Sequence, residues 1–141
     1  MAVDGIKIYR AKTGRWGGTS FGELIKKARR LFKEIESNPR RKLHIRSAYF
    51  KKEKVFFDYF WPHLNQKPPR QRQKRLAYLE CGIELLQNSH HEPTSKANPN
   101  RKSEILHRFA GVTKDDELFF VQVKEDTKTK EKFLMSVFPP D

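Results

Sequence analysis

Apolar side chains recur at helical spacing in the first third of the chain. Between residues 21 and 37, Phe, Leu, Ile and Ala fall every three or four positions, and lysines and arginines fill most of the positions between them. Ser20 and Glu23 form a capping box at the start of this stretch, and Asn38-Pro39 stops it. The pattern predicts an amphipathic helix over residues 21–37.

Two further helices are predicted before residue 89. Residues 51–61 are rich in aromatic side chains whose spacing fits neither a helix nor a strand clearly. The length of this segment and the Lys and Glu residues at its start favour a helix that ends near Pro62. The next helix begins after Pro68-Pro69 and carries apolar residues on one face through residue 88. Gly82 is a weak point in it, so a break at residues 79–82 is possible.

The segments outside these helices are short or irregular. Residues 1–19 predict an arm with a short strand and a glycine-rich turn around Arg15-Trp16, whose spacing matches neither a phosphate loop nor a dinucleotide fingerprint. Residues 43–46 fit either a short strand or the entry to a helix. Residues 89–103 contain two prolines and no periodicity, which predicts a loop long enough to be either functional or disordered.

The last forty residues change to alternating patterns. The alternation predicts three strands, over residues 105–113, 117–125 and 131–138, and the short connections between them favour an antiparallel meander. Helices followed by a meander predict an α+β class. We therefore expect one domain over residues 1–141, in which a helical layer of residues 20–88 packs on a C-terminal antiparallel sheet of residues 104–139.

Alternation also predicts the two faces of this sheet. One face is apolar: Phe119, Val121 and Val123 with Phe133, Met135 and Val137. The other mixes apolar and polar groups: Leu118, Phe120, Gln122 and Lys124 with Leu134, Ser136 and Phe138. The apolar face is expected under the helices. The mixed face suits an RNA-binding platform, or is simply half-solvated, and the sequence leaves open whether His107 or Arg108 joins it.

The net charge of the chain favours some classes of function over others. The 141 residues carry 30 Lys and Arg against 17 Asp and Glu, a formal net charge of +13, which favours RNA or another nucleic acid as partner, then an anionic membrane or an acidic protein. No stretch reaches the ~18–20 apolar residues of a transmembrane helix, and no signal-peptide apolar region opens the chain. Cys81 is the single cysteine, which excludes an internal disulfide and fits a cytoplasmic protein.

RNA cleavage needs no metal or other cofactor, because the 2′-OH of RNA is itself the nucleophile. A general base, a general acid and cations around the phosphorane suffice, and neither a zinc-protease pattern nor an acidic two-metal cluster is present. His107, Arg108, Lys124 and Ser136 are the candidate catalytic residues. His44, Arg46, Lys102, Gln122 and Phe120 are the candidate RNA contacts, with His44 an alternative to His107 as acid or base.

The C-terminal segments also resemble a known family. Residues 103–113 (SEILHRFAGVT), 118–126 (LFFVQVKED) and 133–139 (FLMSVFP) are similar to a nuclease family of phages and mobile elements, grouped with barnase, EndoU, the tRNA-cleaving colicins and RelE. The resemblance implies helices on a curved antiparallel sheet and metal-independent RNA cleavage, often by toxins. By position it points to His107, Arg108, Lys124 and Ser136, while no strand glutamate clearly matches the base of barnase.

The resulting hypothesis is a metal-independent endoribonuclease that leaves a 2′,3′-cyclic phosphate on tRNA or mRNA, as a toxin held by an acidic antitoxin or immunity protein. One alternative is a non-catalytic RNA- or DNA-binding module that uses the same basic surface. Another is a chain whose basic face docks on an acidic protein.

Overall fold

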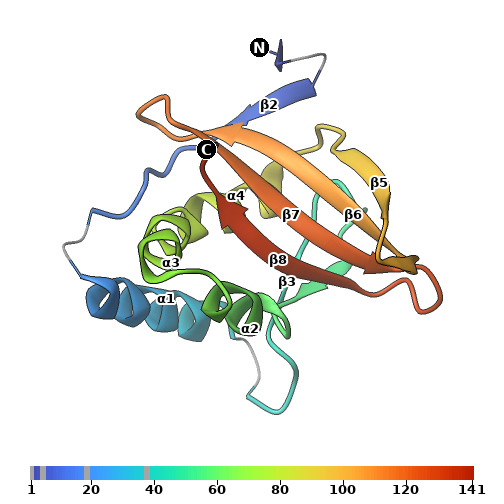
Figure 1. Ribbon diagram of the computed structural model, residues 1–141, viewed down its shortest axis with the longest axis horizontal. Helices are drawn as coiled ribbons and strands as arrows, with labels where there is room; N and C mark the ends of the chain where they lie inside the picture. The colour runs from blue at the N-terminus through green and yellow to red at the C-terminus, as the bar shows by residue number, and fades with distance from the viewer. Residues whose placement is uncertain (1, 4–5, 18–19, 37–38) are drawn as a thin grey trace.

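The computed structural model describes residues 2–3, 6–17, 20–36 and 39–141, with side chains from Lys7 onward in these ranges. Its helices gather on one side of a curled sheet (Figure 1). They are α1 (Phe21–Ile35), α2 (Phe60–Asn65), α3 (Pro69–Leu76) and α4 (Leu79–Asn88). The strands are β1 (Ala2–Val3), β2 (Ile6–Arg10), β3 (His44–Arg46), β4 (Lys54–Phe56), β5 (Thr94–Asn98), β6 (Arg101–Val112), β7 (Leu118–Asp126) and β8 (Lys132–Phe138).

The predicted meander is the centre of the sheet, but it is not the whole sheet. Strands β6, β7 and β8 pair antiparallel in chain order, as expected. On one side β2 pairs parallel with the end of β6 and β5 pairs antiparallel with the rest of it. On the other side β4 pairs parallel with the start of β8, and β3 pairs with β4. The N-terminal half therefore supplies edge strands as well as the helical layer, so the predicted division at residue 104 is wrong.

Helix α1 confirms the predicted amphipathic helix. The Ser20 hydroxyl accepts a hydrogen bond from the backbone N–H of Glu23 at 3.2 Å, which caps the helix. The apolar stripe is buried at Leu24, Ala28 and Phe32, and the cations between these positions are exposed. Asn38, half of the predicted stop, lies outside the described residues.

The helix predicted over residues 51–61 is wrong. Lys51 and Lys52 have φ values of 57° and 66°, a turn that breaks any helix, and the chain then enters β4. Helix α2 starts only at Phe60 and contains Pro62 in its first turn, where the missing N–H leaves no hydrogen bond unmade. Residues 43–46 take the strand alternative, as β3.

The predicted helix after Pro68-Pro69 is present as two helices. Its break falls at Ala77 and Tyr78, just before the predicted 79–82, and Gly82 lies within α4. A Cβ at Gly82 would lie 2.4 Å from Val137 Cγ2. Gly82 is therefore a contact point that lets α4 lie against β8.

The loop predicted over residues 89–103 is wrong as well. Its middle is β5, which forms a hairpin with β6 across the Pro99-Asn100 turn. Most side chains of β5 are exposed. Main-chain hydrogen bonds to β6 form this strand, so no hydrophobic pattern marks it in the sequence.

The core face of the sheet is the apolar face predicted for β7. Phe119, Val121 and Val123 are fully buried there. On β8 the prediction is wrong at three positions, because a bulge makes Leu134 the partner of Val123 while Ser136 stays the partner of Gln122. Leu134 and Val137 thus join the core, Phe133 turns to the opposite face beside Lys124, and Met135 is the extra residue of the bulge.

Gly82→Ala should destabilise the fold. The added methyl must displace Val137 or separate α4 from β8, at a cost of about 1–3 kcal/mol. Gly22→Ala is the matched control, because a Cβ there meets only Ser20 Oγ at 4.0 Å and alanine favours the helix. Urea unfolding monitored by circular dichroism should show a lower midpoint for Gly82→Ala alone. Equal midpoints for the two variants would contradict the close packing of α4 on β8.

Candidate functional site

The mixed face is the side of the sheet opposite the core, and five of the predicted site residues gather on it. Arg108 pairs with Gln122, and Gln122 pairs with Ser136, across three neighbouring strands. Phe120 and Lys124 flank Gln122 at alternate positions of β7 and therefore share its face. We use "mixed face" for these five residues with their neighbours Leu106, Phe133 and Phe138. Of His107 and Arg108, which the sequence could not assign to a face, Arg108 is the one that lies on the mixed face.

Two arginines each lie against the ring of Phe138. The guanidinium carbon of Arg108 lies 5.3 Å from the ring centre, and that of Arg75, from α3, lies 5.0 Å from it. Arg75 Nη1 also donates a 2.7 Å hydrogen bond to Ser136 Oγ, and Arg108 Nη2 donates a 3.3 Å bond to the Gln122 side-chain oxygen. Among the described residues, no carboxylate oxygen lies within 4.0 Å of either guanidinium. Two guanidinium groups against one ring, of which that of Arg108 is exposed, have the chemistry that binds phosphate groups.

Arg75 reaches the sheet because β4 pairs only with the start of β8. The register joins Val55 and Phe56 to Lys132 and Phe133, so the remaining edge of β8 lies against α2 and α3 (Figure 1). Leu76, the next residue of α3, is fully buried in the core. Burial of Leu76 thus fixes Arg75 at the rim of the mixed face.

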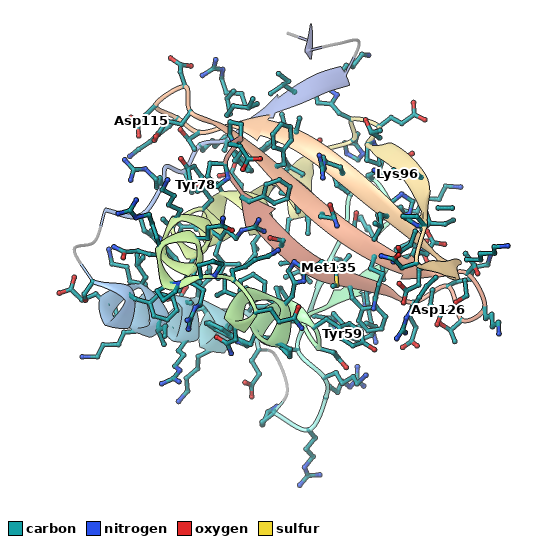
Figure 2. All side chains as sticks on the ribbon, in the orientation of Figure 1. Tyr59, Tyr78, Lys96, Asp115, Asp126 and Met135 are labelled. Carbon is teal, nitrogen blue, oxygen red and sulfur yellow. The ribbon has the colours of Figure 1, made fainter. Side chains whose placement is uncertain are left out.

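A groove of about 510 Å³ continues the mixed face toward the β5–β6 hairpin. Its lining includes Tyr59, His63, Gln122, Lys124 and Phe133. Lys124 Nζ lies 3.9 Å from the centre of the Tyr59 ring and 3.3 Å from Glu104 Oε2. Tyr59 is a large apolar side chain left exposed, and Figure 2 shows it beside α2 near Met135 of the bulge. The groove thus combines an aromatic wall with two cations, Lys124 and Arg101, and three acidic residues, Glu104, Asp126 and Glu131.

His63 is the histidine that lines this groove, and it is half-buried. Burial lowers the pKa of its imidazole below the ordinary value of 6.5. The positive charges of Lys67, Arg75 and Lys124 lower this pKa further. His63 is therefore neutral at pH 7 and able to accept a proton.

His107 lies on the opposite face, which separates it from the other three predicted catalytic residues. It pairs with Val123 of the core face, is 7% exposed and packs edge-on against Phe50. Its Nδ1 lies 2.6 Å from Ser95 Oγ and its Nε2 lies 2.8 Å from Glu125 Oε1. These contacts join β5, β6 and β7 side by side. The prediction that His107, Arg108, Lys124 and Ser136 form one site is wrong, because successive residues of one strand point to opposite faces.

The remaining predicted RNA contacts lie away from the mixed face. His44 and Arg46 are on β3, the last strand beyond β8 and β4. The ring of His44 packs on Phe56, and Arg46 lines a separate cavity with His90. Lys102 is exposed near the start of β6.

Sequence reasoning overlooked Arg75, His63 and Tyr59. Arg75 lies in the basic run of residues 70–75, which is typical of a solvated helix face, and His63 follows Pro62, which is typical of a surface position. The position of Arg75 beside the apolar Leu76 is the signal that places it at a helix–sheet boundary. No sequence signal marks His63, because α2 meets the groove only through tertiary packing.

Two other classes of site were sought in the described part of the chain. No three His, Cys, Asp or Glu side chains there gather closely enough to hold a metal ion. None of the helices described is both long and apolar enough to cross a membrane.

Comparison with known proteins identifies no relative: no family model, no curated protein and no solved structure matches the chain.

His107→Ala should lower stability and leave RNA binding unchanged. The substitution removes hydrogen bonds to Ser95 and to the Glu125 carboxylate, and should lower the free energy of unfolding by about 2 kcal/mol. His90→Ala is the control, because His90 is exposed and should change stability by less than about 0.5 kcal/mol. Chemical denaturation and RNA titration of the folded variants check both parts. Loss of RNA binding by folded His107→Ala would return His107 to the site.

Proposed function

We propose that the protein is a metal-independent endoribonuclease whose site is the mixed face of the sheet and its groove. The observation that carries the proposal is the position of Arg75 and Arg108 against the ring of Phe138, beside Ser136 and Gln122. No carboxylate oxygen of the described residues lies within 4.0 Å of either guanidinium, and the negative charge that acts on Arg75 from further away is that of Asp141. This arrangement is continuous along β7 with Lys124 and the groove that contains His63.

Binding of RNA follows from the chemistry of this surface. Guanidinium and ammonium groups bind phosphates, and the exposed Tyr59 with the half-buried Phe120 and Phe138 offers rings on which unpaired bases stack. The net charge of +13 adds a long-range attraction for any polyanion. Single-stranded RNA suits this combination better than a duplex, whose bases are already stacked.

Cleavage requires one proton acceptor and cations near the phosphate. In the proposed reaction neutral His63 takes the proton of the 2′-OH, and the 2′ oxygen forms a bond to phosphorus as the bond from phosphorus to the 5′ oxygen breaks. Lys124 and the arginine pair stabilise the extra negative charge of the phosphorane. The departing 5′ oxygen takes a proton from water, and a 2′,3′-cyclic phosphate remains.

The biological setting belongs to the same proposal. A basic ribonuclease that acts on tRNA or mRNA in the cytoplasm would need an inhibitor, and an acidic antitoxin or immunity protein could cover the mixed face. Helices packed against a curled, mostly antiparallel sheet agree in layout with the barnase, EndoU, colicin and RelE group. Assignment to that group remains part of the proposal.

His63→Ala should abolish most cleavage while leaving RNA binding nearly intact. Loss of a general base typically slows a reaction by 10²–10⁴-fold, so we expect a rate at least about 100-fold lower. The assay incubates end-labelled single-stranded RNA with EDTA and follows the cyclic phosphate product. His90→Ala is the control and should cleave at the rate of the unsubstituted protein.

The competing functions give different results in that assay. RNA retained without cleavage by the unsubstituted protein would favour the non-catalytic binding module. Failure to retain RNA or DNA at about 50 mM salt, where electrostatic binding is strong, would favour an acidic protein as partner. Cleavage that His63→Ala leaves unchanged would remove His63 from the mechanism.

The pH dependence of cleavage tests the same residue independently. A base must be deprotonated to act, so the rate should rise with pH as His63 loses its proton and then level off. Because burial and neighbouring cations lower the pKa of His63, the midpoint of the rise should lie below 6.5. Initial rates between about pH 4.5 and pH 8 measure it. A midpoint above 6.5 would point to a different proton acceptor.

A further inference from the structure

A second cavity, of about 640 Å³, lies where β7 begins and β8 ends. We call it the Trp16 pocket, and its lining includes Arg15, Trp16, Arg70, Lys74 and Tyr78. The arm before α1, the helix α3 and the end of the chain after β8 each contribute to it. Its size is that of a small-molecule site, and the proposed ribonuclease mechanism makes no use of it.

The wall that carries Trp16 is held in place by several hydrogen bonds. The backbone N–H of Trp16 donates to the carbonyl oxygen of Ala77 at 2.8 Å. Upstream in the arm, the Glu84 carboxylate of α4 accepts bonds from Tyr9 Oη at 2.7 Å and from Thr13 Oγ1 at 2.8 Å. The indole of Trp16 is half-buried. Trp16 is therefore presented as a pre-positioned aromatic surface.

The rim of the pocket is cationic. Arg70 and Lys74 are one helical turn apart on α3, so they lie on the same face of that helix. Both are exposed, and no carboxylate oxygen of the described residues lies within 4.0 Å of either. Arg15 lies 3.4 Å from Glu117 Oε2, the carboxylate of the lining. Three cations against one carboxylate favour an anionic ligand.

The pocket is joined to the mixed face through neighbouring residues in the chain. Lys74 of the pocket precedes Arg75 of the arginine pair, and Pro139 of the pocket follows Phe138. The eight residues from Glu117, just before β7, to Lys124 span about 23 Å. Figure 2 shows Tyr78 of the pocket and Tyr59 of the groove separated along the sheet. One extended strand of several nucleotides could thus contact both.

We propose that the Trp16 pocket binds one nucleotide of the RNA strand held on the mixed face. Its base stacks on Trp16 while Arg70 and Lys74 contact the adjoining phosphate. An aromatic ring beside two unpaired cations is the arrangement that nucleotides prefer. This inference rests on RNA binding by the mixed face, and it extends the substrate from a single phosphodiester to a single-stranded segment that spans the whole of β7.

Fluorescence of Trp16 reports directly on the pocket. The chain has two tryptophans, so Trp61→Phe leaves Trp16 as the only indole and retains a ring against Phe32 and Phe60. The probes are a 2′-O-methyl oligonucleotide of about eight residues, within the length that single-strand sites cover, a 2′-O-methyl dinucleotide, and free nucleoside monophosphates. The 2′-O-methyl groups prevent cleavage during the titration.

We expect the long oligonucleotide to quench Trp16 at concentrations where the dinucleotide and the free monophosphates do not. In the same background Arg70→Gln/Lys74→Gln should weaken binding of the long oligonucleotide about 10-fold, through loss of phosphate contacts, and leave the dinucleotide affinity unchanged. Arg29→Gln/Lys33→Gln is the matched control, with the same charge change and spacing on the exposed face of α1.

Three results would overturn the inference. The first is binding of the long oligonucleotide, measured by anisotropy, with no change in Trp16 fluorescence. The second is an equal loss of affinity in the two double variants, which would reflect overall charge alone. The third is equal quenching by a free monophosphate, which would make the pocket a site for free nucleotides. Failure of the proposed function looks different, because then the unsubstituted protein either binds RNA without cleaving it or does not bind RNA at all.

Discussion

Pairing of β6 with β7 is the constraint on which the rest of the structure depends. The register that places Arg108 opposite Gln122 also places His107 opposite Val123. Because side chains alternate along a strand, one set of residues builds the core under the helices, and the other set is left for a ligand. A shift of β7 by one position would turn Lys124 toward the core and would expose Phe119 and Val121. The same pairing therefore specifies the stability of the fold and the chemistry of its mixed face.

Helix α3 connects that sheet to the proposed substrate path. Its buried Leu76 anchors it in the core, and Arg75 extends from the next position to Ser136 and Phe138. Arg70 and Lys74 project into the Trp16 pocket at the other end of the mixed face. One short helix thus contributes cations to both places, which is a physical reason for treating them as parts of one surface. The helix can hold these charges close together because each remains near solvent.

The cations at the mixed face contribute a small part of the net charge of +13. Glu104 and Glu125 each have a cationic or imidazole partner, and Arg75 and Arg108 have none within ion-pair distance among the described residues. Positive groups that lack carboxylate partners repel one another, so the folded protein tolerates them at a cost in stability that a bound phosphate would offset. Such a compromise between stability and function is expected where a surface is shaped for a ligand.

Local patterns determined much of this protein without reference to its fold. Helical spacing and a capping serine specify α1, and alternation specifies β7 and its buried face. Because successive side chains of a strand point to opposite faces, His107 and Arg108 lie on opposite sides of the sheet. Other features needed the assembled structure: β4 and β5 form because a neighbouring strand offers main-chain hydrogen bonds, and the bulge at Met135 inserts one residue that reverses the face of Phe133. The groove around His63 and the arginine pair depends on how α2 and α3 pack along β8. The periodicity of a sequence shows which way a side chain points relative to its own helix or strand. A site built from several elements depends instead on contacts between residues far apart in the chain, and only tertiary packing decides these contacts.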